Sequence, residues 1–374
     1  MTETLPPSPP VWDMFIRAFH WALVLGVALA AISGFFMPVT WINLHIWAGV
    51  SAAALLLARV LWGIWGSKNA RFTGFVKGPH EVMAHFKDLR AGKAVRHLGH
   101  NPLGALMIMA LLGTVFLLLI TGLAGLGGVF KAGPLGFATS YALGMVALSV
   151  HEILAIFLMG FVALHIAGAA YEGLRTRENL IISMVTGRKE FRKNDHDLPE
   201  VSSRPIWVAM LFGVALAMLA WAGIWATAKP PFGVPVGPPN PTYAEECSAC
   251  HMAYAPSLLP AKNWGTMMGQ LDDHFGEDAS LGQAAIDEIT TWLFKNAADS
   301  VDTKPAHVFS RTNPASPLAI TKTQFWQNTH RNIPDAVFNR PPIYDNGNCV
   351  ACHSDAESAA FYPANISIPK ETIP

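Results

Sequence analysis

The sequence has little charge and almost no cysteine. Charged residues make up only 14% of its 374 residues, while 52% are hydrophobic, a balance typical of a membrane protein rather than of a soluble one. Basic and acidic residues are equal in number, so the formal net charge is zero, and we expect no nucleic-acid partner. The lipid bilayer is the first partner that this composition predicts.

All four cysteines lie in two copies of one pattern, C-x-x-C-H, the attachment signature of c-type haem. A single C-x-x-C also suits a redox disulfide or half a zinc site. Two copies, each followed by His and with no spare Cys, favour two covalent c haems. The thiols would add to the haem vinyl groups, and the adjacent His would be the proximal iron ligand. The residues are Cys247, Cys250 and His251, then Cys349, Cys352 and His353.

Five apolar stretches are long enough to span a bilayer, which takes about 20 residues. They lie at 12–36, 42–65, 103–126, 143–171 and 206–228. Lys and Arg concentrate between the second and third stretches and between the fourth and fifth, whereas the opposite loops hold only Lys131. The positive-inside rule therefore predicts a cytoplasmic N-terminus and an outward fifth helix. Both C-x-x-C-H motifs then lie in the periplasm of a bacterium, beyond the inner membrane, on the side where c haems are attached.

Charge and proline divide the chain further. Residues 1–228 carry a net charge of +6 and residues 229–374 carry −6. A Pro- and Gly-rich linker at 230–241 separates them. We expect a four-helix membrane domain at 1–190, a cytoplasmic segment with a fifth helix at 191–229, and a periplasmic domain at 242–374. The fold class would be all-α throughout.

Four histidines fall inside the apolar stretches, where ionisable residues are rare and indicate function. His151 and His165 are 14 residues apart on one predicted helix, so they share a face and lie roughly 21 Å apart along the axis. Depth in the bilayer pairs His45 with His151 and His20 with His165. Each pair would clamp one non-covalent haem b, with no coordination position left open. The alternatives are histidines that only pack in the bundle, or zinc, which prefers tetrahedral sites.

Two arginines accompany these histidines. Arg59 follows His45 by 14 residues and Arg17 precedes His20 by about one turn. Either side chain would suit a haem propionate or a quinone head group. The alternative for both is an arginine that extends to the membrane interface.

His100, before Asn101 and Pro102, suits either a quinone pocket or a plain helix start, and the capping residues favour the helix start.

The membrane half resembles the bacterial cytochrome b-561 and nickel-hydrogenase cytochrome b group over about residues 10–190. The matching features are 17–21 (Arg-Ala-Phe-His-Trp), His45 with Gly49 and Arg59, 99–104 (Gly-His-Asn-Pro-Leu-Gly), and His151-Glu152 with His165. The resemblance implies a four-helix bundle with two b haems, ligated at His20, His45, His151 and His165. It also implies electron exchange with the quinone pool.

The second half, about 241–374, resembles the small periplasmic dihaem cytochromes c. It matches at both C-x-x-C-H motifs, at 258–261, at 271–276 and at 329–331. The resemblance implies bis-His ligation, with His274 on the first c haem and His330 on the second. Met252, Met267 or Met268 would be alternative ligands that raise the potential, His307 is expected at the surface, and a crossed pairing stays open. The departure from both families is the fusion into one chain.

These observations predict a chain of four redox centres across a membrane: two b haems and two covalent c haems. We expect a respiratory quinol:electron acceptor oxidoreductase that oxidises membrane quinol and passes electrons to a soluble periplasmic redox protein. The acidic head favours a basic partner, or another cytochrome c. Alternatives are reverse flow from a periplasmic donor to quinone, a membrane anchor subunit of a larger redox complex, or an enzyme acting at an open haem.

Overall fold

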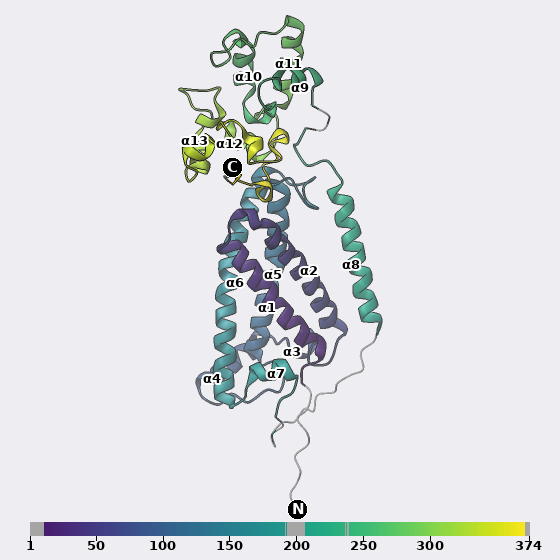
Figure 1. The fold of residues 1–374 in the computed structure, drawn as a ribbon. Coiled ribbons are helices and arrows are strands. Elements are labelled where there is room, and N and C mark those ends of the chain that lie inside the picture. The colour runs from purple at the N-terminus through teal and green to yellow at the C-terminus, as the bar shows by residue number, and fades with distance from the viewer. Residues whose placement is uncertain (1–10, 191, 193–205, 236, 238, 371–374) are drawn as a thin grey trace, which may run out of the picture. The chain divides into compact units, whose positions relative to one another are not determined.

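The computed structural model describes residues 11–190, 192, 206–235, 237 and 239–370. Within these ranges the regular structure is helical, apart from three isolated bridges, and the expected all-α fold is confirmed. Five helices are long and apolar enough to cross a membrane, close to the five stretches expected from the sequence (Figure 1). They are α1 (Met14–Phe35), α2 (Ile42–Trp65), α5 (Pro102–Val129), α6 (Tyr141–Thr176) and α8 (Ile206–Thr227).

The chain divides into two compact units. The first contains Met1–Pro38, Asn43–Gly122 and Ser149–Ala222. The second contains Gly223–Pro374 together with Val39–Ile42 and Leu123–Leu148, which are the short connections at one end of the long helices. The second unit thus holds the whole of the 242–374 domain expected from the sequence and adds these two connections.

The first unit is a helix bundle built from α1, α2, α5 and α6. Leu56, Leu112 and Leu158, from three different helices, meet in one buried cluster, and Phe19 of α1 packs against it. Most other apolar side chains on these helices point outward, as they do when the solvent is lipid. Helix α8 contacts the same unit near its first turn, where Trp207 packs edge-on against Trp65.

Polar caps fix where the membrane helices start. The Asp13 carboxylate accepts from the Ile16 N–H at the start of α1, and also from the Trp62 indole of α2. Asn101 caps α5 through the Gly104 N–H at 2.7 Å, which confirms its expected role as a helix start. The connections on this side hold three further helices: α3 (Phe72–Phe75), α4 (Pro79–Arg90) and α7 (Leu180–Thr186).

The second unit consists of short helices joined by long turns. Leu259, Ile289 and Leu293 are fully buried in one cluster, and Leu258 and Phe309 lie in a second. Its helices are α9 (Pro241–Cys247), α10 (Ala261–Met268), α11 (Gln283–Asn296), α12 (Lys304–Phe309), α13 (Gln324–His330) and α14 (Asp335–Phe338). Seven-residue helices are marginal alone, so packing has to hold them in place.

Asp302 ties several segments of the second unit together. Its carboxylate accepts from Lys131 Nζ at 3.0 Å and from the Tyr141 N–H at 2.8 Å, at the start of α6. The same carboxylate is 2.8 Å from His307 Nε2, and the His307 ring stacks on Tyr141. Burial opposes ionisation of Asp302, but these donors outweigh it and hold the pKa of its carboxyl below the usual range.

Candidate functional site

The structure brings together the membrane histidines in the two pairs that depth predicts. The ring centres of His20 and His165 lie 6.5 Å apart between α1 and α6. Those of His45 and His151 lie 6.0 Å apart between α2 and α6. One helix, α6, therefore contributes to both sites, as the 14-residue spacing requires.

The histidines of the second unit are also paired. His251, next to Cys250, lies 6.1 Å from His274 between ring centres. His353, next to Cys352, lies 6.2 Å from His330. Each C-x-x-C-H histidine thus has its partner from the same half of the unit, without crossing. The four cysteines form no disulfide with one another.

The four separations share a physical reason. An imidazole nitrogen ligates a first-row metal at roughly 2 Å, so two rings on opposite sides of one metal have centres about 6 Å apart. All four pairs lie between 6.0 and 6.5 Å. A hydrogen bond between two ring nitrogens would bring the ring centres closer, to roughly 5 Å. The spacing suits one metal between each two rings, in linear bis-histidine coordination.

Hydrogen bonds determine which nitrogen faces the partner ring. The Nδ1 atoms of four histidines lie 2.7 to 3.0 Å from a backbone carbonyl oxygen. A carbonyl oxygen can only accept, so Nδ1 carries the proton and Nε2 keeps the lone pair that binds a metal. These histidines and their acceptors are His45 with Ala30, His151 with Leu118, His251 with Met252, and His330 with Trp326.

Two of those carbonyls belong to a feature that sequence reasoning missed. Ala30 precedes Ser33-Gly34 on α1, and Leu118 precedes Thr121-Gly122 on α5. The two segments have the same spacing and each receives one imidazole. The signal was the repeated hydroxyl–glycine dipeptide near the same end of two membrane helices, but it points to a site only when the facing histidine is known.

Comparison with known proteins identifies both halves. Residues 11–187 match the prokaryotic cytochrome b561 family, and residues 243–361 match the dihaem cytochrome c family. The chain thus combines a region similar to cytochrome b561 with a region similar to the dihaem cytochromes c. It is an integral membrane electron-transfer protein with b-type and c-type haem domains.

Relatives of the b561 domain are probable Ni/Fe-hydrogenase B-type cytochrome subunits. That of Azotobacter chroococcum mcd 1 is 28% identical over 222 residues, covering 50% of this chain and 90% of the relative. That of Cupriavidus necator is 24% identical over 216 residues, covering 49% and 87%.

Solved structures resemble the dihaem domain. The dihaem cytochrome purified from Rhodobacter sphaeroides is 36% identical and covers 33% of this chain and 96% of that one, with a TM-score of 0.25. The dihaem cytochrome of Shewanella baltica OS155 is 31% identical, covering 36% and 95%, with a TM-score of 0.29.

The b561 domain presents unpaired donors that fit an anionic cofactor. Arg59 is only 3% exposed, lies over the Phe72 ring at 4.7 Å, and has a buried Nη1 without a hydrogen-bond partner. Arg17 donates from Nη1 to the Val185 carbonyl at 2.6 Å, while its Nε is buried without a partner. Buried unpaired donors are costly, so a haem propionate is a fitting acceptor.

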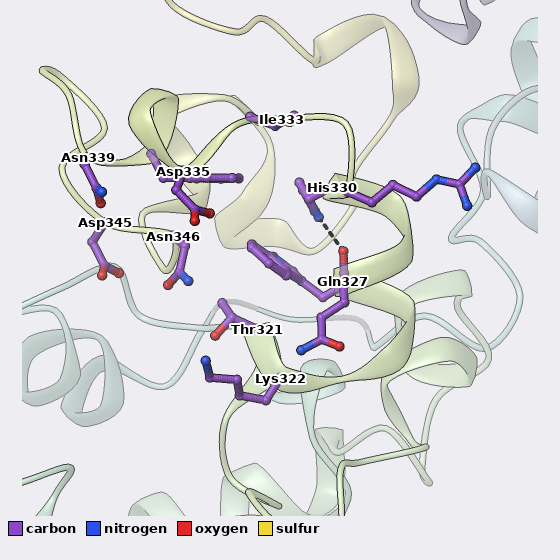
Figure 2. A pocket seen from close by; sticks show the side chains of 12 residues that line it. Thr321, Lys322, Gln327, His330, Ile333, Asp335, Asn339, Asp345 and Asn346 are labelled. Carbon is purple, nitrogen blue, oxygen red and sulfur yellow. Dashed lines mark hydrogen bonds between the residues drawn. The ribbon is translucent and has the colours of Figure 1, made fainter.

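The dihaem domain has room beside one of its histidines. A cavity of about 440 Å³ lies against His330, Trp326 and Phe338 (Figure 2). Trp326 stacks on the His330 ring at 4.4 Å and also provides its carbonyl acceptor. Lys322 and Arg331 line the same cavity together with Asp335 and Asp345, so its basic and acidic side chains are equal in number.

The alternative ligands are engaged elsewhere. Met268 is buried in the apolar cluster with Trp264, and Met267 packs against it. Met252 provides the carbonyl that orients His251. His307 is 45% exposed at its side chain and binds Asp302. The rings that face the two C-x-x-C-H histidines are those of His274 and His330.

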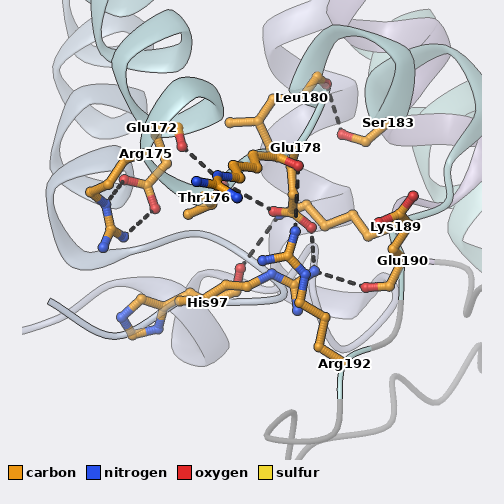
Figure 3. A network of polar contacts seen from close by, with 12 residues as sticks. His97, Glu172, Arg175, Thr176, Glu178, Leu180, Ser183, Lys189, Glu190 and Arg192 are labelled. Carbon is orange, nitrogen blue, oxygen red and sulfur yellow. Dashed lines mark hydrogen bonds and ion pairs between the residues drawn. The ribbon is translucent and has the colours of Figure 1, made fainter.

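One polar network surrounds the end of α6 in the b561 domain. The buried Glu178 carboxylate pairs with Arg96 and with Lys189, while Arg175 forms a two-pronged contact with Glu172 (Figure 3). Arg175 also donates to the Ala94 carbonyl at 2.7 Å. The network holds the 94–97 connection against α6, and His97 packs beside the buried His85.

Proposed function

We propose that this chain oxidises membrane quinol and delivers the electrons to a soluble redox protein in the periplasm. The main support is that the eight histidines expected as haem ligands form four pairs, each with the spacing of bis-histidine iron. Two pairs lie on membrane helices and two include a C-x-x-C-H motif. The cofactors are then two non-covalent b haems and two covalent c haems. When bound, each would cycle between ferric and ferrous iron, carrying one electron.

The protein's own part is to hold and orient these groups. His20 with His165, and His45 with His151, provide the membrane ligands, and Arg59 and Arg17 would meet propionates or a quinone head group. Cys247 and Cys250 anchor one c haem between His251 and His274. Cys349 and Cys352 anchor the other between His353 and His330. Closed coordination favours electron transfer over chemistry at an open iron.

The loop charges support the orientation. A cytoplasmic N-terminus follows from the Lys and Arg of the two longer connections, and it places 242–374 in the periplasm of the bacterial inner membrane. Nine acidic residues against two basic ones lie in 243–299, so that half of the dihaem domain would attract a basic partner.

Redox titration of the purified protein with pyridine haemochrome analysis tests the proposal. We expect two b and two c haems, with all four reduced by a quinol. Fewer than two b haems would contradict it. Low-spin bis-histidine spectra would exclude an enzyme that acts at an open haem.

A second candidate has a specific observation in its favour. The relatives of the b561 domain are named as hydrogenase cytochrome subunits, so this chain would serve as the membrane subunit of a larger redox complex, and electrons would run from a periplasmic donor to quinone. Quinol-dependent reduction of the c haems by the purified chain alone would argue against this candidate. Co-purification with a periplasmic redox enzyme would support it.

A further inference from the structure

The imidazoles of His45 and His151 are received by neighbouring helices in the same way. His45 Nδ1 lies 3.0 Å from the Ala30 carbonyl oxygen and 3.3 Å from Ser33 Oγ. His151 Nδ1 lies 3.0 Å from the Leu118 carbonyl oxygen and 3.1 Å from Thr121 Oγ1. In each case one N–H is shared between a carbonyl and a hydroxyl that lie three residues apart on the receiving helix.

The role of each hydroxyl is fixed by its other contact. Ser33 Oγ donates to the Leu29 carbonyl at 2.6 Å, and Thr121 Oγ1 donates to the Leu117 carbonyl at 2.8 Å. A hydroxyl has one proton, so towards the imidazole it can only accept. By accepting from Nδ1–H, each hydroxyl polarises that N–H bond and makes the imidazole a more electron-rich ligand.

A glycine follows each hydroxyl residue and admits the ring. A Cβ built at Gly34 would lie 3.2 Å from His45 Cε1, and one at Gly122 would lie 3.2 Å from His151 Cε1. That is closer than ordinary van der Waals contact. We call each set of carbonyl, hydroxyl and glycine an imidazole cradle: Ala30, Ser33 and Gly34 on α1, and Leu118, Thr121 and Gly122 on α5.

One ligand of the other membrane pair, His20, lacks this support. His20 Nδ1 is buried without a hydrogen-bond partner among the described residues. The two sites of the b561 domain thus differ in the hydrogen bonds behind their ligands, although both pairs take one histidine from α6. Hydrogen bonding behind an axial ligand is one of the means by which a protein tunes haem iron.

We propose that Ser33 and Thr121 are positioning residues that lower the midpoint potential of the haem between His45 and His151. The inference rests on the proposed function, because it needs a haem at that pair. An electron-rich imidazole stabilises ferric iron more than ferrous iron, so the hydroxyls make this haem harder to reduce. Their effect should be confined to this haem, because the histidines that they contact are its two ligands: Ser33 contacts His45, and Thr121 contacts His151.

Potentiometric titration of the full-length membrane protein, followed in the b-haem absorbance bands, tests the inference. Thr121→Val and Ser33→Ala each remove one acceptor and leave the carbonyl in place. A net hydrogen bond changes an equilibrium about fivefold, which corresponds to an upward shift of about 40 mV for one electron. The double variant should show roughly the sum, because the hydroxyls act on separate ligands.

The chain offers matched controls. Thr114→Val removes a buried α5 hydroxyl that bonds its own helix at Ala110, and Ser51→Ala removes the corresponding group of α2 at Trp47. Each of these hydroxyls donates to a backbone carbonyl of its own helix, so neither variant should move a potential. Thr121→Ser and Ser33→Thr keep the hydroxyl and should restore the wild-type value, which a packing role alone would not do.

Three outcomes are informative. A shift of one b haem only, larger than in the controls and reversed by the conservative variants, supports the inference. Equal shifts of both b haems, or shifts no larger than in the controls, overturn it while leaving the proposed function intact. If His45→Ala retains both b haems, the ligand assignment itself fails, and with it both the proposed site and this inference.

Discussion

His45 and His151 lie with their ring centres 6.0 Å apart, and each is held from behind by a carbonyl of a different helix. The pair therefore joins all four helices of the bundle: α2 and α6 supply the rings, and α1 and α5 supply the acceptors. A ligand site built in this way depends on the relative depth of every helix.

Replacing His45 with alanine should remove one b haem and leave both c haems attached. The partner His151 alone cannot close both axial positions, whereas the thioethers of the c haems lie in another part of the chain. Pyridine haemochrome spectra give the b to c ratio, expected to fall from about 1:1 to about 1:2 if each bis-histidine pair holds one haem. His80→Ala, which changes an exposed histidine of α4, is the control. An unchanged ratio would contradict the assignment.

Replacing Gly122 with alanine should displace the His151 ring. The added Cβ would lie 3.2 Å from Cε1, and such overpacking typically costs about 1–3 kcal/mol. We expect partial loss of one b haem and a lower melting temperature. Gly113→Ala on the same helix is the matched control, since a Cβ there meets nothing within 4 Å. Equal haem content in the two variants would show that the close approach is unimportant.

Replacing Arg59 with methionine should lower the midpoint potential of one b haem. A buried positive charge close to the cofactor stabilises the reduced, less positive iron, and its removal favours the ferric state. Redox titration measures the shift, and Arg59→Lys should recover part of it. Arg90→Met, at an exposed position of α4, serves as the control. An unchanged midpoint potential in Arg59→Met would show that this arginine has no electrostatic effect on a haem.

Replacing Asp302 with asparagine should make the protein less stable near neutral pH. Its folded-state pKa is depressed, so its contribution to the free energy of unfolding is present above the unfolded pKa of about 3.9 and is lost as pH falls through the lower folded value. Losing charge-assisted hydrogen bonds costs about 1.5–3 kcal/mol. The difference in melting temperature between wild type and variant should shrink towards pH 3.

Asp287→Asn is the control for this pH series, because the exposed Asp287 carboxylate accepts from the Gln283 amide of its own helix, while Thr291 donates to its backbone carbonyl, which the substitution keeps. A stability difference that persists unchanged at low pH would mean that Asp302 acts through packing rather than through its charge.

Much of the site could be predicted from the sequence. Two C-x-x-C-H motifs predict covalent haem without any knowledge of the fold, because the chemistry needs two thiols and an imidazole on one short segment. Hydropathy locates the five membrane helices, and helix direction then pairs His20 with His165 by depth. These inferences work because a bilayer leaves the chain few arrangements.

Other features could not be predicted from the sequence. The carbonyls of Ala30 and Leu118 look like any other helix carbonyl until a histidine from another helix meets them. Asp302 stands in an ordinary turn, yet it accepts from a lysine and a helix start more than 150 residues away. His85 lies in a charged connection between membrane helices, yet it is buried beside His97.

The sequence by itself determined which residues can bind iron, which segments cross the membrane and which half carries the acidic charge. These properties depend on the chemistry of each residue and on the spacing of residues along a single helix. The tertiary structure decided how each imidazole is oriented, which hydroxyls and glycines stand behind it and which buried donors remain unpaired. Those properties arise only when helices distant in the chain approach within hydrogen-bonding distance, and no local pattern specifies that approach.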